Sequence, residues 1–162
     1  MAIAITLRAT APGQLDPMMD WVHDAYFEHE DLEYDAVEGV VTVEFAQERG
    51  PHEQLPGSEL LRRTWRYREL RVPFLRCRLS IRCVTGVEKD ESRFDQPGML
   101  LGIEFDGGHV KLAAVTGPAV SMAVTGLDVE LNVTDEVMSW VRRREGRWTF
   151  IESDRLIDDA AD

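Results

Sequence analysis

Hydrophobic and polar residues alternate at every second position along most of the chain, which is the pattern of half-buried β-strands. The clearest example is the segment 75–84, where apolar residues at 75, 77, 79, 81 and 83 are separated by polar ones. Similar alternation predicts strands over residues 2–8, 40–45, 120–124 and 127–133. We therefore expect sheets with one apolar face.

Turn-forming residues between the apolar runs predict β-hairpins. One hairpin is expected around the turn 35–39 and another around Asp106-Gly-Gly108. A closing hairpin is predicted from residues 137–141 and 147–151, with its turn around Arg144-Glu-Gly146, although residues 135–144 also fit a short helix.

Two segments raise the question of helix. Asp16-Pro17 predicts the start of one short helix, with Asp16 as N-cap and Pro17 at the first helical position. The start of the segment 59–71, after Ser58, could cap a helix. However, Trp65 and Tyr67 alternate with arginines as in a strand, and we favour the strand.

These elements predict a mainly β fold with one or two short helices, built as an antiparallel sandwich or a partly open barrel. The 162 residues suit a single domain spanning residues 1–162. Residues 48–58 are expected to form a flexible polar loop and residues 158–162 a frayed acidic tail.

The charge narrows the choice of partners. A formal net charge of −12 disfavours nucleic acid and anionic membranes, which both attract cationic surfaces. The distribution is uneven, because residues 14–57 carry −11, residues 58–82 carry +6 and residues 142–147 carry +3. No secretory leader or membrane-spanning apolar run is recognisable, so we expect a cytoplasmic protein that does not bind membranes.

The basic block has two interpretations. Its candidate arginines are Arg66, Arg68, Arg76, Arg78 and Arg82. They could bind an anionic ligand, with aromatic neighbours for stacking. We favour an outward-facing ladder of ion pairs with Glu33, Glu38 and Glu44 on facing strands, since such pairs stabilise sheets.

A polar cluster is the other candidate site. His23-Asp24 and His29-Glu30-Asp31 bring imidazoles close to carboxylates, and His23, Asp24, His29 and Asp31 could together bind a divalent metal or transfer protons. The spacing matches no helical metal motif, so no metal is assigned. His52 and His109 have no partner for nucleophilic catalysis nearby in the sequence.

Other chemistry is not indicated. Phosphate-binding loops, dinucleotide fingerprints, nucleophile elbows and paired-cysteine motifs are absent from the sequence, so we expect no cofactor and favour a noncatalytic role. Cys77 and Cys83 would lie about 20 Å apart on one strand, too far for a disulfide, and both are predicted to be core thiols. Trp140, Trp148, Phe150 and Tyr34 would line a ligand cavity if the sheet closed.

The run Trp-Val-His-Asp-Ala-Tyr-Phe at 21–27, followed by Leu32-Glu-Tyr-Asp35 and Val40-Val-Thr-Val43, resembles small bacterial β-domain families of unknown function, some of them immunity-type proteins. The resemblance implies a compact β domain and a partner-binding role. We therefore expect a noncatalytic protein-interaction module whose acidic surface binds a basic protein. The alternatives are a small-ligand or metal site on His23, Asp24 and His29, and a ligand-carrying barrel.

Overall fold

The mainly β fold predicted from the alternation is confirmed. A computed structural model describes residues 3–47, 59–90, 98–116, 119–146 and 151–157. Strands account for 70% of it and helical turns for 11%, and the strands form one antiparallel sheet. The predicted loop 48–58 and tail 158–162 lie outside the described residues, as do Trp148 and Phe150.

Through most of the chain, successive strands are joined by turns where the sequence predicted them. The first half contains β1 (Ile3–Ala9), the 3₁₀ helix η1 (Pro12–Leu15), α1 (Asp16–Val22), β2 (Tyr26–Phe27), the 3₁₀ helix η2 (His29–Asp31), β3 (Leu32–Asp35), β4 (Val40–Gln47) and β5 (Glu59–Arg63). The second half contains β6 (Tyr67–Ile81), β7 (Val84–Lys89), β8 (Gly98–Phe105), β9 (His109–Thr116), β10 (Val120–Val124), β11 (Val129–Gly146) and β12 (Ile151–Ile157).

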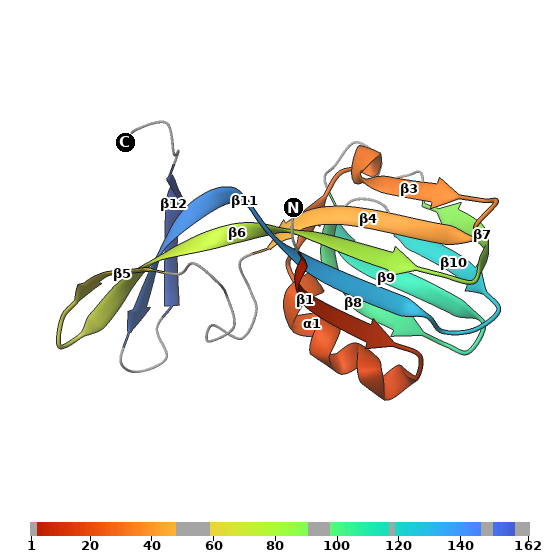
Figure 1. Ribbon diagram of the computed structural model, residues 1–162, viewed down its shortest axis with the longest axis horizontal. Helices are drawn as coiled ribbons and strands as arrows, with labels where there is room; N and C mark the ends of the chain where they lie inside the picture. Colours follow the sequence, from red (N-terminus) through yellow and green to blue (C-terminus); the bar gives the residue numbers. More distant parts are fainter. Residues whose placement is uncertain (1–2, 48–58, 91–97, 117–118, 147–150, 158–162) are drawn as a thin grey trace.

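The sheet folds back on itself without closing. Its strands run in the order β1-β11-β6-β4-β2-β8-β9-β10-β7, and β3, β5 and β12 attach to β4, β6 and β11. In Figure 1 the strands β8, β9 and β10 lie behind β4, β6 and β11, so the two halves of the sheet face one another. The sheet is not closed into a barrel.

A hydrophobic core fills the space between the two halves. Leu79 and Ile81 of β6 pack in the same cluster as Leu112 of β9 and Met122 of β10. Helix α1 covers one end of this core, with Trp21 only 1% exposed. The alternation of buried and half-buried residues along β4 is what places Val41, Val43 and Phe45 inside, as the sequence pattern predicted.

The longest strands extend beyond this core and form a projecting arm (Figure 1). We define the arm as residues 59–72, residues 141–146 of β11, and β12; the body is the rest of the described residues, 3–47, 73–90, 98–116 and 119–140. Residues of β6 and β11 pair from Val72 and Val141 out to Tyr67 and Gly146. All five residues of β5 are exposed, so the arm is uncovered where β5 lies.

Three local predictions are wrong. The N-cap of α1 is Leu15, not Asp16, because η1 runs directly into α1 and the helical backbone already includes Leu15. The closing hairpin forms, since β11 pairs antiparallel with β12, but its turn is not at Arg144-Glu-Gly146, because β11 continues to Gly146, and residues 135–144 are strand instead of helix. The continuity is possible because the register of β11 shifts between Val133 and Val137 and its pairing with β6 then resumes.

The third correction concerns Cys83. It was predicted to share the buried face with Cys77, but strand β6 ends at Ile81, and Cys83 is exposed with a left-handed φ of 60°. Two residues beyond the end of a strand, the alternation of faces no longer applies. Cys77 is buried as predicted, and both cysteines are free thiols. None of the helices in the described part of the chain has the length and apolar character needed to cross a bilayer.

Candidate functional site

The five candidate arginines do not form one site. Arg76, Arg78 and Arg82 lie on the body, whereas Arg66 and Arg68 lie at the far end of the arm. Each group has its own partners.

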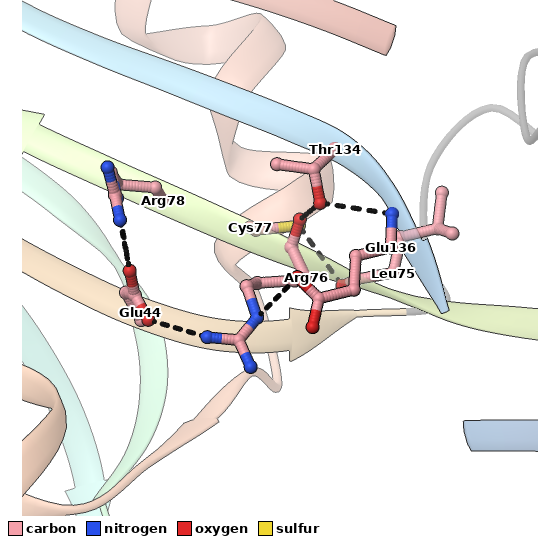
Figure 2. A network of polar contacts seen from close by, with 7 residues as sticks. All are labelled: Glu44, Leu75, Arg76, Cys77, Arg78, Thr134 and Glu136. Carbon is pink, nitrogen blue, oxygen red and sulfur yellow. Dashed lines mark hydrogen bonds and ion pairs between the residues drawn. The ribbon is translucent and has the colours of Figure 1, made fainter. Parts of the chain in front are cut away.

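On the body, one glutamate holds two arginines across neighbouring strands. Glu44 of β4 lies opposite Arg78 of β6, and its Oε1 accepts hydrogen bonds from Arg78 Nε at 3.1 Å and Nη2 at 2.6 Å. Its Oε2 accepts a hydrogen bond from Arg76 Nη1 at 3.0 Å (Figure 2). The hydrogen bond from Arg78 is the largest cause of a lowered pKa for Glu44, while partial burial opposes it. This is the ion-pair ladder that the sequence predicted for Glu44.

The same network fixes the irregular part of β11, next to the base of the arm. Arg76 Nε lies 3.2 Å from Glu136 Oε2, and the Thr134 hydroxyl donates to the Arg76 carbonyl at 2.9 Å (Figure 2). The Glu136 N–H in turn donates to Thr134 Oγ1. Arg76 therefore ties β4 and β11 together at the point where the register shifts, which is a structural role.

Arg82 is paired with acids that the sequence interpretation did not name. Its guanidinium lies 3.7 Å from Asp128 Oδ1 and 3.5 Å from Glu130 Oε1, and Arg8 also contacts Asp128 at 3.1 Å. The pKa of Glu130 is lowered, first by the hydrogen bond from Asn132 and then by Arg82. The alternating segment 127–133 already placed Asp128 and Glu130 on the polar face, so that signal was available.

Glu33 and Glu38 do not belong to the ladder. Glu33 lies on β3 opposite Thr42 of β4, so a whole strand separates it from β6, and Glu38 lies in the turn 36–39. In the described ranges neither side chain forms an ion pair with an arginine. Their predicted pairing is therefore wrong, because facing strands were inferred without knowing the strand order.

These two glutamates instead border a hollow at the β3–β4 hairpin. We call it the acidic hollow; it has a volume of about 830 Å³ and is lined by Glu33, Tyr34, Asp35, Ala36, Glu38, Val40 and Thr42. Asp35 shapes the turn, since its Oδ1 accepts hydrogen bonds from the N–H groups of Val37 and Glu38, both at 3.0 Å. Val37 is 93% exposed beside it.

At the other end of the molecule, the turn between β5 and β6 displays arginine and aromatic side chains. We call this region the arm tip; it borders a hollow of about 530 Å³ lined by Arg63, Thr64, Trp65, Arg66, Tyr67, Arg68, Glu145 and Gly146. Thr64 holds the turn, because its Oγ1 accepts from the N–H of Tyr67 at 3.1 Å and its own N–H donates to the Tyr67 carbonyl at 2.8 Å. The turn therefore presents Trp65, which is 74% exposed, on a backbone held by these hydrogen bonds.

Positive charge is concentrated at the arm tip. Arg63 and Arg68 lie directly opposite one another on β5 and β6, an arrangement of like charges that costs stability. Arg68 is paired with Glu145 at 2.6 Å, whereas no carboxylate in the described ranges forms an ion pair with Arg63 or Arg66. Arg66 instead stacks on Trp65, with its guanidinium carbon 4.5 Å from the ring centre.

The predicted polar cluster assembles only in part. His23 follows α1, and its Nδ1 lies 3.3 Å from Asp24 Oδ2. Asp31 Oδ2 accepts a hydrogen bond from the Glu28 N–H at 2.7 Å and so stabilises the turn at η2. His29 begins η2, and its side chain lies outside what the structure describes.

No metal centre is found in the described part of the chain, where no three His, Cys, Asp or Glu side chains are grouped as around a metal ion. His109 lies 3.8 Å from Asp106, whose carboxylate accepts hydrogen bonds from the N–H groups of Gly108 and His109 and has a lowered pKa for that reason. These contacts stabilise the turn between β8 and β9. His52 lies outside the described residues.

The ligand-carrying alternative required a closed sheet around an apolar cavity. The sheet is open, and core side chains pack between its halves. Two of the aromatic residues predicted to line the cavity lie elsewhere. Tyr34 borders the acidic hollow, and the ring of Trp140 on β11 stacks against the guanidinium of Arg71.

Comparisons with protein-family models, with curated proteins and with solved structures found no match to the chain. The resemblance to small bacterial β-domain families therefore stays a prediction.

Proposed function

We propose that the chain is a noncatalytic protein-interaction module whose acidic body binds a basic protein partner. One observation carries this proposal: the charge is divided between body and arm. Among the described residues, the arm contains nine arginines and five acids, while the body contains six basic residues and 18 acids. The described body therefore carries a net charge of −12 and the arm one of +4.

The acidic hollow is the part of the body best suited to such a partner. Glu33 and Glu38 are exposed and are not neutralised by the arginine ladder, which uses Glu44, Asp128 and Glu130. Tyr34 and Val37 supply exposed apolar surface next to the carboxylates. Interfaces gain most of their affinity from aromatic and arginine side chains, so a partner rich in these residues would find both charge and apolar contact here.

A further feature supports the proposal. The net charge of the body disfavours nucleic acid, because phosphate would be repelled over most of the surface.

A titration with a basic probe tests the proposal. A blocked peptide that alternates arginine and tryptophan should bind at low salt, and binding should weaken as salt is added. The double variant Glu33→Gln with Glu38→Gln should lose about five- to tenfold in affinity, since each exposed charge contributes at most about 1 kcal/mol. Calorimetry and tryptophan fluorescence measure this.

The matched control removes two charges elsewhere on the body. Asp20 of α1 and Glu104 of β8 are exposed and distant in sequence from the hollow. Asp20→Asn with Glu104→Gln should leave the affinity within about twofold of the unmodified chain. Equal losses in both double variants would mean that the probe senses net charge alone, and the hollow would not be a binding surface.

A further inference from the structure

The arm tip and the acidic hollow of one molecule are complementary in chemistry and lie far apart. The tip carries Arg63, Arg66 and Arg68 around an exposed Trp65. The hollow carries Glu33, Asp35 and Glu38 around Tyr34. The two surfaces of the same chain therefore carry opposite charges, and each has an exposed aromatic side chain.

These two surfaces cannot meet within one molecule. Figure 1 shows the arm at one end of the longest axis and the β3–β4 turn at the other. The arm is built on β6 and β11, which both continue from the body into the arm and whose pairing resumes beyond the register shifts between Val133 and Ser139. A contact between tip and hollow therefore requires two copies of the chain.

We propose that the basic partner of the acidic hollow is the arm tip of a second copy, so that molecules associate head to tail. This inference rests on the proposed function and names its partner. Contact between two arm tips is disfavoured, because it would bring the arginines of two copies together. Contact between tip and hollow relieves the repulsion between Arg63 and Arg68, since it supplies carboxylates to both.

The geometry determines the form of the assembly. Tip and hollow are different surfaces, so each contact leaves one free tip and one free hollow at the ends. Association should therefore depend on concentration, have no fixed size at high concentration and weaken steeply with salt. In 0.5 M salt the exposed charges are screened over a few ångströms and the chain should be monomeric.

Two inactivating variants make the test specific. The tip variant combines Trp65→Ala with Arg66→Glu, and the hollow variant combines Glu33→Lys with Glu38→Lys. All four side chains are exposed, so folding should be kept, which circular dichroism and thermal unfolding verify. Sedimentation velocity at low salt should show the unmodified chain as dimers and larger species, and each variant alone as a monomer.

The decisive sample is the mixture of the two variants. The hollow variant still has a tip and the tip variant still has a hollow, so an equimolar mixture should give a complex of two chains and nothing larger. The control Asp20→Asn with Glu104→Gln should associate like the unmodified chain. An unmodified chain that stays monomeric at low salt and high concentration overturns the proposal, as does a mixture without complex.

The outcomes separate this inference from the proposed function. If the unmodified chain is monomeric but the arginine-tryptophan peptide binds the hollow, then the partner is another protein and only the self-association is wrong. If neither occurs, both are wrong. If each variant still associates by itself, another surface is responsible and the head-to-tail contact is excluded.

Discussion

Glu44 and Arg78 face one another across β4 and β6, with 2.6 Å between Oε1 and Nη2. The glutamate side chain is 29% exposed, and the contact also involves Arg76, so it is a partly shielded pairing of one acid with two bases. Because the arginines lower the pKa of Glu44 in the folded chain, the contact has a defined dependence on pH.

We predict that the folded state loses stability in acid partly through Glu44. A carboxyl whose folded pKa lies below its unfolded value contributes fully above the unfolded value, and the contribution disappears as the pH falls through the folded one. The free energy of unfolding should therefore decline below the ordinary glutamate value of 4.5. Urea denaturation between pH 3 and 7 measures it.

Replacement of the same residue gives a second prediction. Glu44→Gln should destabilise the chain by about 1–2 kcal/mol at pH 7. Hydrogen bonds to a charged group contribute more to stability than neutral ones, but the partial exposure of Glu44 reduces this contribution. It should also flatten the pH dependence. Glu33→Gln, which removes an exposed glutamate outside the ladder, is the control and should change stability by less than about 0.5 kcal/mol. Equal effects would show that Glu44 does not stabilise the sheet.

The two thiols should react very differently. Burial raises the pKa of Cys77 to about 12, so it is almost entirely protonated at pH 8 and shielded, while Cys83 is exposed. A colorimetric thiol reagent should titrate one thiol in the native chain and two in denaturant. Cys83→Ala should abolish the native reaction, and a native reaction that survives in this variant would contradict the burial of Cys77.

Gly39 should not tolerate a side chain. It ends the turn between β3 and β4 with a φ of 65°, and a Cβ there would lie 2.9 Å from the Val84 carbonyl oxygen. Gly39→Ala should therefore cost about 1–3 kcal/mol through backbone strain and this contact. Gly126 has open space around its Cα and no left-handed φ, so Gly126→Ala is the matched control and should be nearly neutral. Chemical denaturation compares the two.

Two tryptophans should separate folding from binding. Trp21 is 1% exposed and Trp65 is 74% exposed. Trp21→Ala should destabilise the chain by about 3–5 kcal/mol, because it leaves a large cavity under α1. Trp65→Ala should change stability by less than about 0.5 kcal/mol. A large loss of stability from Trp65→Ala would mean that this residue supports the arm instead of offering a contact surface.

Alternation predicted the strands well wherever a strand had one buried face. The segment 75–81 is an example, since Leu75, Cys77, Leu79 and Ile81 are all buried. It failed at Cys83, where the chain has left the strand, and at residues 135–146, where a register shift interrupts the alternation while the strand continues. The arm could not be predicted from alternation. Residues 67–72 have a strand pattern like that of the body, and the pattern does not show that the core ends next to them.

The candidate sites were predicted less completely, because strand order is a tertiary property. Glu44 could be matched to Arg78 on charge alone, but Glu33 and Glu38 were assigned to the same ladder without knowledge that β4 lies in between. The division of the arginines between body and arm tip follows from the length of β6, which composition does not reveal.

The continuation of β6 and β11 from the core to the tip also has a mechanical consequence. A turn mounted on a short flexible loop must give up many conformations when it is captured, and that loss weakens capture. Here the body fixes the direction in which the turn at Trp65 points before any encounter. A force applied at this turn would therefore pass to the core along the two strands, across the register shifts between Val133 and Ser139.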